Sequence, residues 1–256
     1  MRLLTVFASL LALCSVSLNA QVVYIVEDFS SGSSSSIDAS EASGTFNSKW
    51  GFYQVPEHPL SIGVPDFGSD NALIFDMSSN EDNNDLVGFY SLNSYPRTSS
   101  AGPLRVSVDL YMEQHSTVNV TWVSDDGGVF DHRDAKYNLH PSGDNLFCLV
   151  WENWRDGGSY GGTWAPGISI PNYYSPTTWI TVRMTLNDPV GCKFEYWDGS
   201  DWVVLRDETA TGDPSANYRF NLALRPNGAG NQVGIDNIVI QYGDTVPVAL
   251  SEFVVE

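Results

Sequence analysis

Apolar and polar residues alternate with a period of two along most of this chain. In the segment 105–113 an apolar residue occupies every second position from Val106 to Met112, with polar residues between them. The same alternation recurs in the segments 117–122, 178–186 and 219–224. This period is typical of β-strands that bury one face, and no segment keeps a helical period over three turns. The sequence therefore predicts an all-β fold.

The turn signals divide these runs into strands. Asp198-Gly199 separates two strand-like runs within 192–206, which predicts a β-hairpin. Residues 30–48, 125–145 and 156–176 are rich in turn-forming residues and are predicted as long loops.

Two strand-like runs, one near each end of the chain, are rich in Val and Ile and also carry acidic residues. One carries Glu27 and Asp28, and the other, near the end of the chain, carries Asp236. The first and last strands of an antiparallel sandwich are often neighbours, so we expect these two strands to pair. Their carboxylates could then meet and hold a cation, since calcium prefers carboxylate and carbonyl oxygens.

The first twenty residues resemble an export signal. Arg2 precedes the short apolar run 3–16, and small residues at 17–20 offer a cleavage site. We therefore predict a signal peptide at 1–20, one sandwich domain at 21–243, and a tail or the start of a linker at 244–256. The mature protein would be secreted or held at the cell surface.

The charge of the chain excludes several kinds of partner. The formal net charge is −19, which repels phosphate backbones and makes nucleic acid an unsuitable ligand. No run after the signal is long enough to cross a bilayer, so membrane insertion is not expected. Neutral glycans are compatible with this charge, and so are divalent cations.

Two cysteines remain once the signal is removed. Cys148 and Cys192 both lie in strand-like runs. In an exported protein they could form a disulfide, and the alternative is two buried thiols.

Several short motifs resemble the concanavalin/laminin-G-like jelly rolls of secreted carbohydrate-binding modules. They are the two acidic runs, the segments around Trp50 and Trp179, and the closing Gly-Ile-Asp-Asn-Ile at 234–238. The resemblance covers most of residues 22–243 and implies a two-sheet antiparallel β-sandwich. It also implies a structural calcium ion held by Glu27 or Asp28 together with Asp236.

The tail shows a second resemblance. Residues 246–253 are similar to the Pro-Val-x-Leu-x-x-Phe junction that often precedes C-terminal sorting regions in bacterial surface proteins.

A cluster of aromatic residues predicts the binding surface. Sugar rings have apolar C–H faces that stack on aromatic rings, and their hydroxyls need polar partners. The chain offers both between 151 and 174, so we predict a polysaccharide or glycan ligand there. The alternative is that Trp151 and Trp164 belong to the core. The predicted ligand-binding residues are Trp151, Trp154, Tyr160, Trp164, Tyr173 and Tyr174.

A glycan-cleaving enzyme, either a glycoside hydrolase or a polysaccharide lyase, is the alternative function. The polar face of 105–113 would present Arg105, Asp109, Tyr111 and Glu113 together, and Arg183, Arg219 and Arg225 could join them from neighbouring strands. Paired carboxylates can serve as general acid and base in glycoside cleavage. The strand motifs of jelly-roll glycosidases and lyases are absent, so we favour a secreted, non-catalytic carbohydrate-binding or adhesion module.

Overall fold

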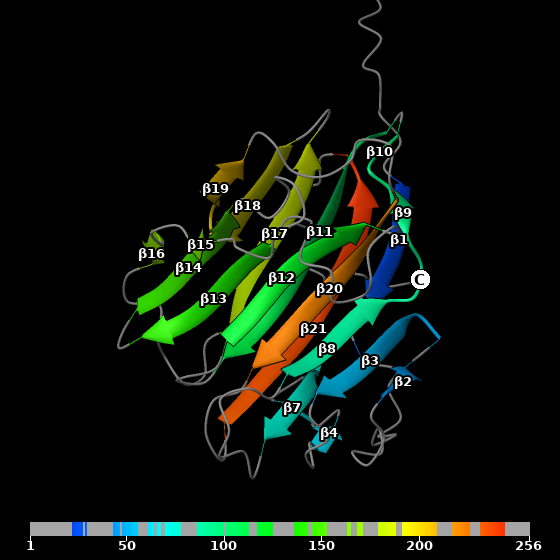
Figure 1. The fold of residues 1–256 in the computed structure, drawn as a ribbon, viewed down its shortest axis with the longest axis vertical. Coiled ribbons are helices and arrows are strands. Elements are labelled where there is room, and N and C mark those ends of the chain that lie inside the picture. Colours follow the sequence, from blue (N-terminus) through cyan, green and yellow to red (C-terminus); the bar gives the residue numbers. More distant parts are fainter. Residues whose placement is uncertain are drawn as a thin grey trace, which may run out of the picture.

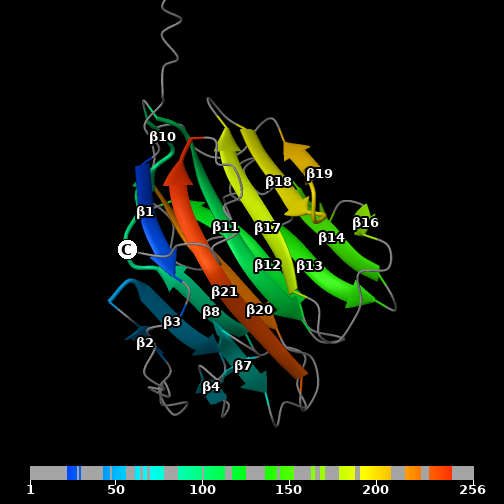
Figure 2. The same ribbon diagram turned by 180° about the vertical axis from the view of Figure 1, so that it is seen from behind.

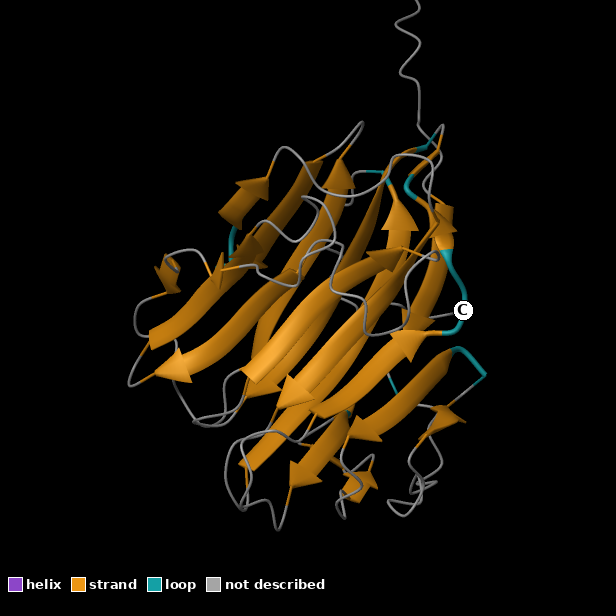
Figure 3. Ribbon diagram, in the orientation of Figure 1, coloured by secondary structure: helices purple, strands orange, loops and turns teal. Residues whose placement is uncertain are grey.

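Every regular element in the described part of the chain is a β-strand, as Figure 3 shows. The computed structural model describes residues 22–27, 29, 43–46, 48–55, 61–63, 66–67, 70–77, 86–99, 101–112, 117–124, 136–142, 145–152, 163–164, 168–170, 179–187, 191–208, 217–225 and 231–243. For some of these residues only the backbone is described.

The strands form two large antiparallel sheets that pack face to face (Figures 1 and 2). Sheet A has the order β19-β18-β17-β11-β21-β7-β4, with β1 added to β21 and β10 added to β11. Its strands are β1 (Val22–Glu27), β4 (Ser61–Gly63), β7 (Leu73–Met77), β10 (Thr98–Ser99), β11 (Gly102–Met112), β17 (Trp179–Asn187), β18 (Gly191–Trp197), β19 (Trp202–Glu208) and β21 (Asn231–Tyr242).

Sheet B has the order β15-β14-β13-β12-β20-β8-β3-β2, with β16 added to β14 and β9 added to β20. Its strands are β2 (Ser43–Phe46), β3 (Trp50–Val55), β8 (Leu86–Ser91), β9 (Tyr95–Pro96), β12 (Thr117–Ser124), β13 (Lys136–Ser142), β14 (Asn145–Glu152), β15 (Thr163–Trp164), β16 (Ile168–Ile170) and β20 (Asn217–Arg225). A small separate sheet pairs β5 (Asp66–Phe67) with β6 (Asp70–Asn71).

This arrangement confirms the predicted two-sheet antiparallel sandwich. Strands β1 and β21 pair, with Glu27 opposite Ile238, so the first and last strands among the described residues are neighbours (Figure 2). The predicted hairpin is formed by β18 and β19. Its turn is held by the Asp198 carboxylate, which accepts the N–H groups of Ser200 and Asp201, both at 2.8 Å.

The three predicted long loops are wrong in part, because each contains a strand. Strand β2 lies within 30–48, β13 within 125–145, and β15 and β16 within 156–176. Apart from β13, which runs between two strands of sheet B, these are short strands at the edges of that sheet. Strand β2 pairs with β3, and β15 and β16 pair with β14. Ladder hydrogen bonds to these neighbours hold segments whose own residues favour turns, so local propensity is a weak guide here.

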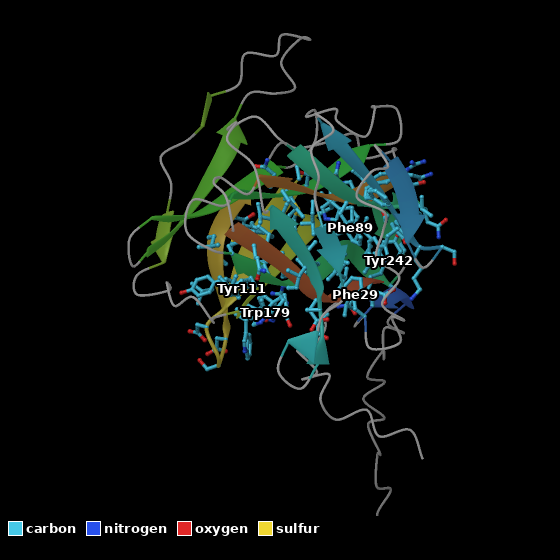
Figure 4. The ribbon with its side chains drawn as sticks, turned by 90° about the horizontal axis from the view of Figure 1, so that it is seen from below. Phe29, Phe89, Tyr111, Trp179 and Tyr242 are labelled. Carbon is cyan, nitrogen blue, oxygen red and sulfur yellow. The ribbon has the colours of Figure 1, made fainter. Side chains whose placement is uncertain are left out.

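The core lies between the sheets and is built from the inward residues of each strand. Trp50 of sheet B stacks on Phe89 with ring centroids 4.9 Å apart, and Trp122 meets Phe220 edge to face at 5.8 Å. Figure 4 shows Phe29, Phe89 and Tyr242 between the two sheets. Burial of such large rings is the main favourable term in the stability of a sandwich.

Candidate functional site

One row of cross-strand partners runs over the outer face of sheet B. Gly51 of β3 pairs with Tyr90 of β8, which pairs with Asn221 of β20. Asn221 pairs with Thr121 of β12, and Thr121 pairs with Lys136 of β13. These positions alternate with core residues such as Phe220 and Leu222, so the described side chains of the row face away from the core.

The row ends at a pair of tryptophans. Trp151 of β14 is the cross-strand partner of Trp164 of β15. In the antiparallel pair of β13 and β14, Tyr137 lies opposite Val150, so Lys136 and Trp151 are the next positions of the same row. Only the backbone of these two tryptophans is described. The register alone brings two of the predicted ligand-binding residues together at one edge of sheet B.

At the other end of the row an aromatic ring lies on a glycine. A Cβ atom added to Gly51 would come within 2.3 Å of Tyr90 Cζ and 2.5 Å of its hydroxyl oxygen. Glycine therefore leaves the space in which the half-buried Tyr90 ring lies against the sheet. Beside it Asn221 and Thr121 are buried, and Arg219 is half-buried. Sequence reasoning missed this element, although a glycine inside an alternating strand is a signal of close approach.

The remaining predicted aromatics are Trp154, Tyr160, Tyr173 and Tyr174. They lie outside the described residues, and their role in binding stays a prediction.

The β11 residues that the alternative, enzymatic function would use have separate partners on the outer face of sheet A. Arg105 Nη1 donates to the carbonyl oxygen of Gly243 at 2.7 Å. Tyr111 is in ring contact with Trp179 at 5.7 Å between centroids. The Asp109 carboxylate accepts hydrogen bonds from the Thr181 hydroxyl and from Asn237 Nδ2, the latter at 2.8 Å. Glu113 lies outside the described residues, and catalysis by this set stays the alternative interpretation.

The expectation that three arginines join this face is wrong for two of them. Arg183 of β17 lies in sheet A, where its Nε and Nη2 atoms both reach Glu195 Oε2 at 2.8 Å. Arg219 and Arg225 belong to β20, which is in sheet B. Alternation identifies which residues share one face of a strand, but it does not assign strands to sheets.

Burial raises the pKa of Asp109, and the hydrogen bonds from Thr181 and Asn237 offset part of that rise. The folded state thus holds the proton to a higher pH than the unfolded state. The contribution of Asp109 to stability falls as pH rises from its ordinary pKa of 3.8 through the raised value.

Replacement of Asp109 by Asn removes this titration. We expect the melting temperature of the Asn variant, relative to wild type, to rise as pH increases from 4 and then to level off. Thermal melts at half-unit steps between pH 4 and 8 measure this difference. A difference that is constant over the series, or that falls, would show that Asp109 does not titrate in this way.

The carboxylates of Glu27 and Asp236 do not meet, contrary to expectation. Glu27 faces the space between the sheets, where its Oε2 accepts Trp50 Nε1 at 3.4 Å and the Lys49 ammonium at 3.1 Å. Asp236 is the cross-strand partner of Asp109 on the outer face of sheet A. Its Oδ1 accepts the backbone N–H of Asn237 at 2.7 Å. The pairing of β1 with β21 was correct, but the two carboxylates lie on opposite faces of that sheet.

Within the described part of the chain, no three acidic, His or Cys side chains are grouped so as to hold a metal ion. Asp28, the third predicted ligand, lies outside that part.

The two cysteines belong to different sheets. Cys192 of β18 is buried in the core, and Cys148 lies in β14 of sheet B, where only its backbone is described. Their pairing stays a prediction, and titration of thiols in the denatured protein would decide it.

The described residues contain no helix that is long and apolar enough to cross a membrane.

No protein-family model and no curated protein matches the chain. Solved structures do resemble its fold. The potassium-bound carbohydrate recognition domain of Emp46p matches with a TM-score of 0.53 and 11% identity, over 82% of this chain and 97% of that one. The carbohydrate recognition domain of Emp47p gives 0.50 and 12%, over 89% and 97%. The exoplasmic/lumenal domain of VIP36 with Ca2+ and Man3GlcNAc gives 0.50 and 10%, over 82% and 93%.

At such low identity these matches show the fold alone. The chain has the concanavalin-like sandwich that the sequence motifs predicted, and two domains titled carbohydrate recognition domains are among its structural neighbours. The bacterial surface context suggested by residues 246–253 stays a prediction.

Proposed function

We propose that this protein is a non-catalytic carbohydrate-binding module whose binding face is the outer row of sheet B. The observation that supports this proposal most directly is the continuous row of cross-strand partners over sheet B. It begins at Gly51 and Tyr90, continues through Asn221 and Thr121, and ends at the Trp151–Trp164 pair. The row combines aromatic residues with two small polar residues, which are the residue types that a glycan-binding site requires. Aromatic rings stack on sugar C–H faces, and amides and hydroxyls pair with sugar hydroxyls.

Three further points support the proposal. Emp46p and Emp47p are described as carbohydrate recognition domains, and VIP36 was solved with Man3GlcNAc, on the same kind of sandwich. The net charge of −19 favours a neutral glycan over an acidic one. The signal-like residues 1–20 would bring the module to the cell surface or outside the cell, where such glycans are found.

Retention on insoluble neutral polysaccharides tests this function. We expect wild type to be retained by at least one of cellulose, chitin, mannan and xylan. The Trp164→Ala and Trp154→Ala variants should bind that glycan about tenfold more weakly, because each loses one stacking ring.

The matched control is Val204→Ala, which removes an exposed side chain from β19 in the other sheet and should leave retention unchanged. Wild type that passes through every column would overturn the function. Equal retention of wild type and both tryptophan variants would show that the binding face does not lie on sheet B.

A structural calcium ion is part of the proposal, with Asp236 as its carboxylate ligand. Glu27 does not fit this role, because its oxygens already accept the Lys49 ammonium and two N–H groups. Calcium prefers carboxylate and carbonyl oxygens, and VIP36 was solved with Ca2+.

Chelation tests the ion. A tightly bound ion stabilises only the folded state, so we expect a chelator to lower the melting temperature by roughly 5 °C or more. The Asp236→Asn variant should melt at the same temperature with and without chelator. Superimposable melting curves of wild type under both conditions would remove calcium from the proposal.

A further inference from the structure

The indole of Trp179 lies along the outer surface of sheet A. Trp179 of β17 pairs with Tyr111 of β11, which pairs with Gly234 of β21, so Gly234 lies two strands away. A Cβ atom added to Gly234 would nevertheless be only 2.7 Å from Trp179 Cη2. Two strand spacings are about 10 Å, so the indole reaches Gly234 only by lying nearly parallel to the sheet. The indole thus lies along the outer surface of the sheet rather than standing away from it, and it is half-buried.

The neighbours of Trp179 hold the ring in this position. The centroid of the Tyr111 ring lies 5.7 Å from that of Trp179, with the ring planes at 42° to each other. Ile74 Cδ1 would lie 2.8 Å from the same Cβ atom added to Gly234. Tyr111 and Ile74 are buried, whereas Trp179 is half-buried. Figure 4 shows Tyr111 and Trp179 at the margin of the sandwich on the side of sheet A, outside the core.

The next row along the same strands is polar. Thr181, Asp109 and Asp236 each lie two residues beyond Trp179, Tyr111 and Gly234, which places them about 7 Å farther along the same face. Their hydrogen-bonded network is fixed by Asn237, whose φ of 49° lies in the left-handed region. Asn237 donates its side-chain amide to Asp109 and its backbone N–H to Asp236.

We propose that this outer face of sheet A is a second saccharide-binding site, specific for a neutral pyranose. The sugar stacks its C–H face on the half-buried Trp179 indole, and its hydroxyls bond to the row of Asp109, Thr181 and Asn237. Carboxylates are strong acceptors for sugar hydroxyls, and they repel uronic acids and sulfated sugars. The inference rests on the glycan class of the proposed function but uses a different sheet and different residues.

Retention measurements on variants of the full chain test the second site. On the polysaccharide that retains wild type, Trp179→Ala should bind about fivefold to tenfold more weakly, as expected for the loss of one stacking ring. The combination of Trp179→Ala with Trp164→Ala should weaken binding beyond either single change. The matched control is Trp202→Ala, which removes another half-buried tryptophan from the outer face of sheet A, on β19.

Loss of Trp179 could also disturb the fold, so two gentler variants accompany it. Thr181→Val and Asp109→Asn keep the side-chain shape and remove a hydroxyl or a charge. Each should weaken binding about twofold to fivefold, with near-ultraviolet circular dichroism like that of wild type.

The outcomes separate the two proposals. Retention of wild type with unchanged binding by Trp179→Ala, Thr181→Val and Asp109→Asn overturns the second site and leaves the proposed function standing. Equal weakening by Trp202→Ala and Trp179→Ala also overturns it, because the effect would then not be local. Wild type that binds no neutral polysaccharide overturns both.

Discussion

Replacement of Glu27 by Ala should lower the free energy of unfolding by about 3 kcal/mol. Two donors lose their acceptor in this variant, Trp50 Nε1 at 3.4 Å and the backbone N–H of Phe29 at 3.3 Å. Each buried donor left without a partner costs about 1–3 kcal/mol. Phe29 has a φ of 53°, unusual for a bulky residue, and the Glu27 carboxylate supports the turn that buries it. Urea unfolding followed by circular dichroism measures the loss.

Two further variants identify which contact of Glu27 matters. Glu27→Gln keeps one acceptor oxygen and should cost roughly half as much as Ala. Lys49→Ala removes only the ion-pair partner, whose side chain is 44% exposed, and should cost less than about 1 kcal/mol. If Lys49→Ala is as destabilising as Glu27→Ala, the ion pair rather than the two N–H donors supplies the stability.

Replacement of Trp122 by Ala should be at least as destabilising, at about 3–5 kcal/mol. Trp122 is fully buried on β12, and its Nε1 donates across the sandwich to the carbonyl oxygen of Met184 on β17, at 3.5 Å. The variant loses the ring contact with Phe220 and leaves a large cavity between the sheets. We expect the melting temperature to fall by on the order of 10 °C, measured by differential scanning calorimetry.

Trp122→Phe is the matched control, because it keeps an aromatic ring and removes only part of the volume. It should lose roughly half as much stability as Ala. A loss below about 1 kcal/mol for Trp122→Ala would mean that the two sheets close over the cavity, and that this part of the core is not tightly packed.

Parts of the fold follow directly from local sequence. The alternation around Val106 and Val108 predicts which side chains are buried, and all of those positions up to Met112 are in the core. Asp198 and Gly199 predict the hairpin, and Gly199 has the positive φ, 101°, that favours glycine. These predictions succeed because a strand's period and a turn's conformation depend on residues adjacent in the chain.

The two outer faces could not be predicted in this way. Tyr90 lies over Gly51, and Trp179 reaches Gly234, only because distant strands pair in a particular register. Glu27 looked like a solvated or metal-binding acid, yet it faces Trp50 between the sheets. Nothing within a few residues of Glu27 indicates the inward orientation.

The sequence by itself determined the class of fold, the faces of individual strands, and a charge that favours neutral ligands. Only the tertiary structure decided which polar and aromatic positions stand in one row. In the folded protein the Trp151–Trp164 pair continues the Tyr90 row on sheet B, and Trp179 lies in the row next to that of Asp109 on sheet A. The physical reason is that cross-strand register is set by the packing of the whole sandwich, so no local pattern contains it.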